Sequence, residues 1–122
     1  MLLQRYFPIG KRGGSGVAGS GLKVALSRSD IYKFNPTAGA TATTVSVTAT
    51  ATLGTGPYTY LWNGGFRITA NSPNSATTTC SATGRGIASD DLETMICTVT
   101  DSLGATAFNT VTVEIQIGGL AK

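Results

Sequence analysis

The stretch "CTVTDSLGATAFNTVTVEI", residues 97–115, decides the fold of this chain. Apolar and polar side chains alternate on both sides of its centre, where Asp-Ser-Leu-Gly occupies positions 101–104. A period of two on either side of a short turn segment is the pattern of two β-strands joined by a hairpin. We therefore predict a long antiparallel hairpin, with Cys97 and Val99 on the buried face of its first strand.

The turn contains the residue types that tight turns require. Asp and Ser side chains hydrogen-bond to nearby backbone groups, and glycine adopts a positive φ without strain. The sequence predicts that Asp101 and Ser102 begin the turn by capping backbone N–H groups, and that Gly104 completes it.

The same alternation recurs upstream of the hairpin. "TVSVTATATL", residues 44–53, alternates strictly, and "YTYLW", residues 58–62, places three aromatic side chains on one face. "NGG" at 63–65 predicts a tight turn, and "FRITA" at 66–70 predicts a short edge strand. About seven strands, frequent turns and no helical period predict an all-β, antiparallel sandwich.

The composition agrees with this prediction. Twenty threonines and sixteen glycines favour strands and turns over helices. The predicted core lies where the strands turn their apolar side inward: Val47, Tyr60, Trp62, Cys80, Cys97, Val99 and Val113.

Two of these stretches together resemble a known family. "YTYLWNGG" followed by the hairpin of residues 97–115 resembles PKD-type immunoglobulin-like domains, which have an aromatic-x-Trp strand and a Val-Thr-Asp-Ser-x-Gly hairpin. The resemblance covers roughly residues 36–117 and implies an immunoglobulin-like (PKD-like) β-sandwich of about seven strands. Glu93 and Met95 replace the small residue and the tyrosine that usually lead into the sixth strand. Ala49 stands where an immunoglobulin domain has its first cysteine, so the usual disulfide between the sheets cannot form.

The two cysteines leave two alternatives open. Cys80 and Cys97 are expected to point inward from opposite sheets, where they would form a disulfide or remain buried free thiols. We favour free thiols, because a chain made and kept in a cytoplasm usually keeps its cysteines reduced.

The charge is concentrated near the N-terminus. Residues 1–33 have a net charge of +5, whereas residues 34–122 have a net charge of −2. The sequence predicts a basic, Gly-rich arm at 1–30, a sandwich at 31–118 and a tail at 119–122. The arm residues expected to dock on a partner are Leu2, Leu3, Arg5, Tyr6, Phe7, Lys11, Arg12, Lys23 and Arg28.

Two partners suit such an arm, an acidic protein surface or nucleic acid. We favour the protein surface, because Tyr6 and Phe7 are not interleaved with the basic residues as base stacking would require. No stretch is long enough to predict a membrane span.

Catalysis and cofactors find little support in the sequence. The chain contains no histidine, and its serines and cysteines lack a recognisable activating partner, so we predict no enzyme and no cofactor. Asp90, Asp91 and Glu93 are the only candidate metal ligands, but they lack the Asp-x-Asp-x-Asp-Gly pattern of a calcium loop. We interpret them as a solvated acidic loop and predict no metal.

The start of the chain does not have the pattern of a secretion signal, because its apolar run is short and its charges follow that run. A small sandwich, a basic arm and only 12% charged residues resemble structural components of tailed-bacteriophage virions, made in the host cytoplasm and present in many copies on a symmetric lattice. Capsid decoration, tail and head–tail accessory proteins are the forms considered. The alternative is a spacer or carbohydrate-binding module of a bacterial surface or secreted protein, with Tyr58, Tyr60 and Trp62 as its sugar platform if they faced solvent; for Trp62 we favour packing in the core.

Overall fold

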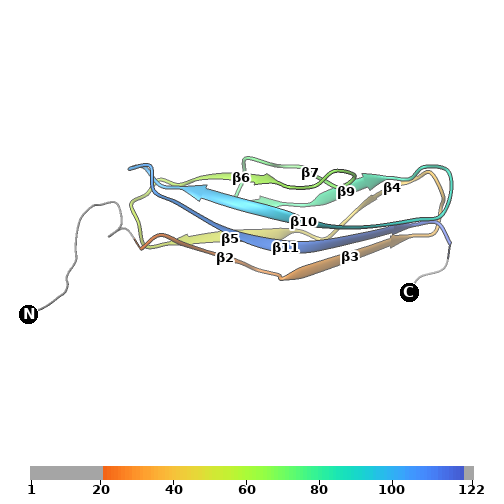
Figure 1. Ribbon diagram of the computed structural model, residues 1–122, viewed down its shortest axis with the longest axis horizontal. Helices are drawn as coiled ribbons and strands as arrows, with labels where there is room; N and C mark the ends of the chain where they lie inside the picture. Colours follow the sequence, from red (N-terminus) through yellow and green to blue (C-terminus); the bar gives the residue numbers. More distant parts are fainter. Residues whose placement is uncertain (1–20, 120–122) are drawn as a thin grey trace, which may run out of the picture.

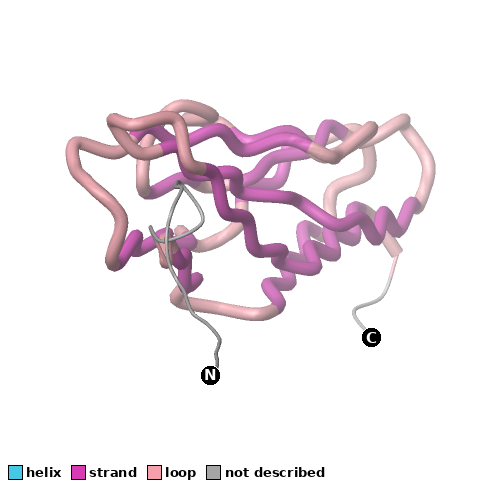
Figure 2. The backbone as a smooth tube through the Cα atoms, turned by 60° about the vertical axis from the view of Figure 1, so that its left-hand side comes forward, coloured by secondary structure: helices cyan, strands magenta, loops and turns pink. Residues whose placement is uncertain are grey.

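The computed structural model describes residues 21–119, which form ten strands and no helix (Figure 1). The strands are β2 (Lys23–Leu26), β3 (Asp30–Asn35), β4 (Thr41–Thr43), β5 (Val47–Thr52), β6 (Thr59–Asn63), β7 (Thr69–Ala70), β8 (Thr77–Thr78), β9 (Cys80–Thr83), β10 (Ser89–Thr100) and β11 (Thr106–Ile117). Figure 2 shows that these residues consist of strands and connecting loops alone. Residues 21–119 accordingly include no helical segment of membrane-spanning length and hydrophobicity.

The first sheet has the strand order β3-β11-β10-β6. The predicted hairpin forms its centre, since β10 and β11 pair antiparallel over twelve residues each, from Ser89 opposite Ile117 to Thr100 opposite Thr106. β6 extends the sheet antiparallel to β10, with Trp62 opposite Cys97. β3 lies parallel to β11, so one pair departs from the fully antiparallel arrangement that the sequence predicted.

The second layer consists of two groups, β2-β5-β8 and β4-β9-β7. Thr44 extends the β4–β9 pairing by one residue: its N–H donates to the Cys80 carbonyl (2.8 Å), and its hydroxyl accepts from the Cys80 N–H (3.1 Å). The chain itself joins the two groups, because β4 runs into β5 and β8 runs into β9 after short interruptions. β2 and β3 are likewise one stretch of chain, which passes from the second layer to the first. When each of these three pairs is counted once, the ten segments reduce to the about seven strands that the sequence predicted.

The core fills the space between the two layers. Six residues predicted for it are buried: Val47, Trp62, Cys80, Cys97, Val99 and Val113. Tyr60 is only partly buried and packs against the margin of the core. Ile68, Met95, Val111, Ile115 and Ile117 complete the large, fully buried side chains.

The sandwich begins earlier in the chain than the sequence predicted. Residues 23–26 form β2, which pairs antiparallel with β5 and buries Val24. Lys23 and Arg28, assigned from the sequence to the arm, therefore lie on the sandwich itself. This strand was not predicted because four residues are too few to show a clear period of two, and because they directly follow a Gly-rich segment.

The other predicted docking residues lie outside the described part of the chain. These are Leu2, Leu3, Arg5, Tyr6, Phe7, Lys11 and Arg12. The described chain starts at one end of the long axis, beside the β10–β11 hairpin, and finishes at the opposite end (Figure 1).

Candidate interaction surfaces

Asp101 organises the end of the molecule at which the described chain starts. Its side chain is nearly buried, and its Oδ1 accepts hydrogen bonds from the N–H groups of Leu103 (3.0 Å) and Ala105 (2.9 Å). Its Oδ2 accepts from the Thr55 N–H (3.1 Å) in the β5–β6 loop. Burial by itself raises the pKa of this carboxyl, but the backbone N–H groups outweigh it and lower the pKa below its usual value. The predicted capping role of Asp101 is confirmed, and Gly104 has the expected positive φ of 92°.

Ser102 does not cap the turn, contrary to the prediction. Its N–H (2.9 Å) and its hydroxyl (3.1 Å) both donate to the carbonyl of Thr55. Ser102 therefore ties the hairpin to the β5–β6 loop, and the two loops form one unit.

The same end of the molecule exposes two leucines. Leu53 follows β5 with a φ of 62° and is 59% exposed, and Leu103 at the hairpin tip is 75% exposed. A side chain at Gly54 would meet Asp101 Oδ2 and Leu22, so the backbone here is tightly packed. We call Leu53, Leu103 and the loops that carry them the leucine end.

Glu93 lies within strand β10 with Asp90 and Asp91, so the acidic loop predicted from the sequence is wrong. Its carboxylate accepts three backbone N–H groups: Oε1 from Phe66 (2.8 Å) and Ile68 (3.0 Å), and Oε2 from Arg67 (2.8 Å). Burial raises the pKa of Glu93, but these three N–H groups and the charge of Arg67 outweigh it and lower the pKa.

The segment between β6 and β7 is not the tight turn that "NGG" predicted. The chain does not fold back on β6 but crosses to β7, which pairs with β9 in the other layer. A side chain at Gly65 would overlap the carbonyl of Ile68, and one at Gly64 would approach the carbonyl of Thr94 to 2.8 Å. The glycines are needed for this close packing. "FRITA" contains the short edge strand that was expected, reduced to Thr69–Ala70.

Phe66 is the most exposed large apolar residue of the described chain, at 88%. Phe66 and Arg67 border a groove of about 340 Å³ that Thr69, Ser81, Ala82 and Thr83 complete. We call residues 64–68 the Phe66 loop.

A larger groove of about 510 Å³ lies where β3 approaches the segment between β4 and β5. It has apolar walls and both charge signs: Arg28, Asp30, Ile31, Tyr32, Val45, Leu92, Thr112 and Glu114. Arg28 Nε donates to the Ser46 carbonyl (3.2 Å), which holds that side chain against the second layer. We call this the acidic groove.

The remaining acidic residues do not form a metal site. Asp91 accepts a hydrogen bond from Arg85 Nη1 at 3.3 Å and forms an ion pair with it. Residues 21–119 contain no group of three or more His, Cys, Asp or Glu side chains arranged to hold a metal ion.

The sugar platform of the alternative hypothesis is wrong. Trp62 is 2% exposed, and its Nε1 donates to the Ser75 carbonyl (2.8 Å). Tyr58 and Tyr60 are partly buried against the core, and the Tyr58 hydroxyl donates to the Leu53 carbonyl (2.6 Å). Trp62 therefore belongs to the interior, and the two tyrosines are partly covered, so the three rings do not form a solvent-facing platform.

Cys80 and Cys97 are free thiols, as favoured from the sequence. Both are fully buried, and burial raises the pKa of each to about 11. They remain protonated at neutral pH and pack as small apolar side chains.

No protein-family model matches this chain, and no curated protein matches it in sequence. Its structure is similar to the solution structure of the PKD domain of human KIAA0319, with a TM-score of 0.54. The fold is that of a PKD-type immunoglobulin-like domain. The likeness covers 90% of this chain and 97% of that domain at 19% sequence identity, so it establishes the fold alone. PKD-type domains are typically non-catalytic modules, and their function depends on what their surfaces contact.

Neither the Phe66 loop nor the acidic groove was predicted from the sequence. The only signal for the loop was a Gly pair before Phe-Arg-Ile, which marks a special backbone but says nothing of the distant carboxylate that holds it. The acidic groove joins residues from four separate segments, and no local pattern contains it.

Proposed function

We propose that this protein is a structural component of a tailed-bacteriophage virion, a capsid decoration or head–tail accessory protein. It docks through its N-terminal segment and displays a PKD-type domain. The observation that carries the proposal is the contrast between residues 1–20 and the sandwich. The described residues form a continuous hydrophobic core between the two layers, and residues 1–20 contain a separate concentration of apolar and basic side chains.

Charge supports docking by the N-terminal segment. The described residues carry five basic and six acidic side chains, a net charge of −1. Arg5, Lys11 and Arg12 place three further positive charges in residues 1–20, with no acidic residue among them. This arrangement suits an acidic protein surface, with electrostatic attraction steering the encounter and apolar contacts holding the complex.

The shape of the sandwich supports display. The chain enters the described structure at Gly21, at the leucine end. The loop between β9 and β10 lies at the other end of the long axis (Figure 1). A partner bound by residues 1–20 would leave that loop directed away from the docking surface. The same separation of the chain ends suits a spacer within a longer protein, which is the second candidate function.

The test compares the full chain with variants on phage particles assembled without this protein. The first variant lacks residues 1–20, and the second has Leu2, Leu3, Tyr6 and Phe7 replaced by serine. We expect both to bind at well below full occupancy, because each large apolar side chain contributes roughly 1.5–3 kcal/mol when fully buried. A third variant with Arg5, Lys11 and Arg12 replaced by serine should bind more slowly and show less dependence on salt.

Full occupancy by the variant lacking residues 1–20 would overturn the proposal and move the contact to the sandwich. If only the basic residues matter and binding collapses steeply with salt, nucleic acid becomes the better partner.

A further inference from the structure

The Phe66 loop is built to hold one aromatic side chain in solvent. One carboxylate, that of Glu93, receives three successive backbone N–H groups of the loop. Ile68, which is fully buried, anchors the loop in the core next to Phe66. A loop fixed in this way loses little conformational entropy when it binds.

Phe66 and Arg67 together have the character of a binding anchor. Aromatic and arginine side chains dominate the binding energy of protein interfaces, in particular where they enter a pocket on the partner. An 88% exposed phenyl ring is unfavourable in the isolated molecule, because its apolar surface remains in water. The acceptor should offer an apolar pocket for Phe66 and negative charge for Arg67.

The acidic groove has these properties. Val45, Leu92 and Tyr32 line it with apolar surface and are each between 44% and 65% exposed. Asp30 and Glu114 supply negative charge, and its volume of about 510 Å³ leaves room for a phenyl ring. Arg28 also lines the groove and keeps its positive charge beside the Ser46 carbonyl, so the three charged side chains of the groove sum to −1.

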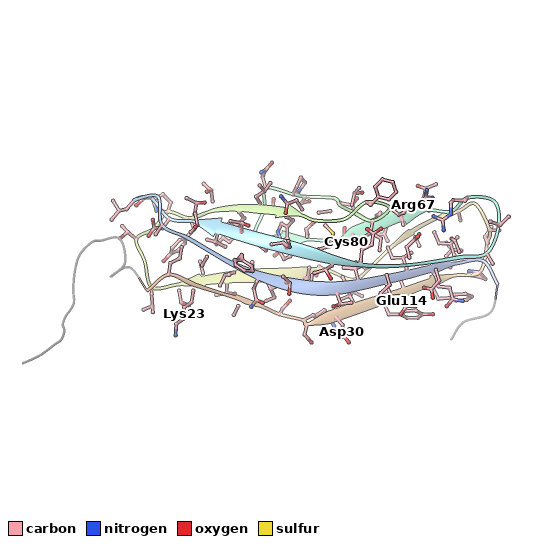
Figure 3. The ribbon with its side chains drawn as sticks, viewed as in Figure 1. Lys23, Asp30, Arg67, Cys80 and Glu114 are labelled. Atoms are coloured by element: carbon pink, nitrogen blue, oxygen red, sulfur yellow. The ribbon has the colours of Figure 1, made fainter. Side chains whose placement is uncertain are left out.

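We propose that Phe66 of one copy inserts into the acidic groove of a second copy, with Arg67 facing Asp30 and Glu114. Figure 3 shows Arg67 at one edge of the molecule and Asp30 and Glu114 toward the opposite edge. The Phe66 loop therefore does not contact the acidic groove of the same molecule. The contact is therefore head-to-tail. Such a contact leaves a free loop and a free groove at the two ends of any pair, and it continues into a ring or an open row.

A contact of one aromatic anchor and one charged side chain is weak between free molecules. The contact becomes effective when another interaction holds many copies on one surface. The high local concentration of copies then raises the occupancy of the contact without any additional binding energy. The proposal does not rest on the virion function. It concerns the purified protein alone, so its failure leaves the docking of residues 1–20 untouched, and the reverse also holds.

The first test measures self-association of the full chain by sedimentation over a wide concentration range. We expect the apparent dissociation constant of Phe66→Ser to rise by about thirtyfold or more, the loss typical of a central aromatic anchor. Phe108→Ser is the matched control, because Phe108 is also exposed (69%) but lies in strand β11, and its association should equal that of the wild type. A wild type that stays monomeric at all concentrations, or equal effects of the two variants, would overturn the proposal.

The second test exchanges charges between the loop and the groove. Arg67→Glu and Asp30→Lys should each abolish association, because the first brings a carboxylate to Asp30 and Glu114, and the second brings an ammonium group to Arg67. When the two variants are mixed, every loop can find a groove of opposite charge, so association should return. Thermal melting of each variant verifies that it is folded. A folded mixture that remains monomeric, or a single variant that associates like the wild type, would show that the Phe66 loop and the acidic groove do not meet.

Discussion

Two carboxylates hold loops that are distant in sequence. Glu93 binds three N–H groups of residues 66–68, and Asp101 binds N–H groups on both the β5–β6 loop and its own hairpin. Each carboxylate accepts these bonds more strongly when it is ionised, and it makes them only in the folded state. Both are therefore acid-sensitive points of the fold, since hydrogen bonds to the charged form lower a pKa.

This arrangement predicts a defined loss of stability in acid. The pKa values of Glu93 and Asp101 are lowered from their ordinary values of 4.5 and 3.8, so the unfolded state binds protons at a higher pH than the folded state does. Their contribution to the free energy of unfolding is complete above these ordinary values and declines as the pH falls through the lower folded-state values. The melting temperature should therefore be level near neutral pH and drop below about pH 4.5.

The Glu93→Gln variant distinguishes the contribution of Glu93 to the acid decline in stability from that of Asp101. We expect a lower melting temperature at neutral pH, because the amide group brings an N–H toward the backbone N–H groups of the loop, and a shallower decline in acid. Asp30→Asn is the control, since Asp30 is an exposed carboxylate at the start of β3. An acid decline that is the same in the wild type and in Glu93→Gln would contradict the assigned role.

At the scale of elements, β2 is the segment whose importance the sequence concealed. It covers the edge of β5, and Asn109 Nδ2 of β11 donates to the Val24 carbonyl at 3.1 Å, which ties β2 across to the other sheet. Without β2, the backbone edge of β5 and the apolar surface under Val24 would be open to water. Exposed strand edges of this kind promote aggregation.

Two shortened chains test this role. A chain that starts at Gly21 should melt cooperatively at a temperature close to that of the full chain. A chain that starts at Asp30 should be clearly less stable, with a loss of about 2–4 kcal/mol for a buried valine and its strand hydrogen bonds. Denaturant unfolding followed by circular dichroism measures both. Equal stability of the two chains would show that the sandwich needs no more than residues 30–119.

The elements also show where prediction from the sequence succeeds. Strict alternation identified β10 and β11 and the inward side of Trp62, because a period of two directly records which face of a strand is buried. The Gly64–Gly65 pair indicated an unusual backbone conformation but not the direction in which the chain continues. Burial of Ile68 in the core, rather than the turn itself, directs the chain to the other layer. The anchor from Glu93 joins residues more than twenty positions apart, and no local pattern encodes such a contact.

At the scale of the whole molecule, six of the nine exposed large apolar residues of the described chain lie in three separate places. The leucine end lies where the described chain starts, whereas the Phe66 loop and the acidic groove lie on the body of the sandwich (Figures 1 and 3). One end would bind the surface on which the protein assembles, and the sides would meet neighbouring copies. Under the two proposals, Leu103 and Phe66 would have different tasks, although both are exposed apolar side chains.

The leucine end should contribute to docking together with residues 1–20, because the chain joins the two directly. The double variant Leu53→Ser, Leu103→Ser removes apolar surface that is already in water, so its stability should stay within about 0.5 kcal/mol of the wild type. Its occupancy on phage particles assembled without the protein should nevertheless fall, since the lost contacts lie beside the docking segment. Ile87→Ser is the matched control: Ile87 is 66% exposed in the β9–β10 loop at the opposite end of the long axis, and its replacement should leave occupancy unchanged. If Ile87→Ser lowers the bound copy number and the double leucine variant does not, the sandwich stands on the particle in the reverse orientation, with its leucine end outward.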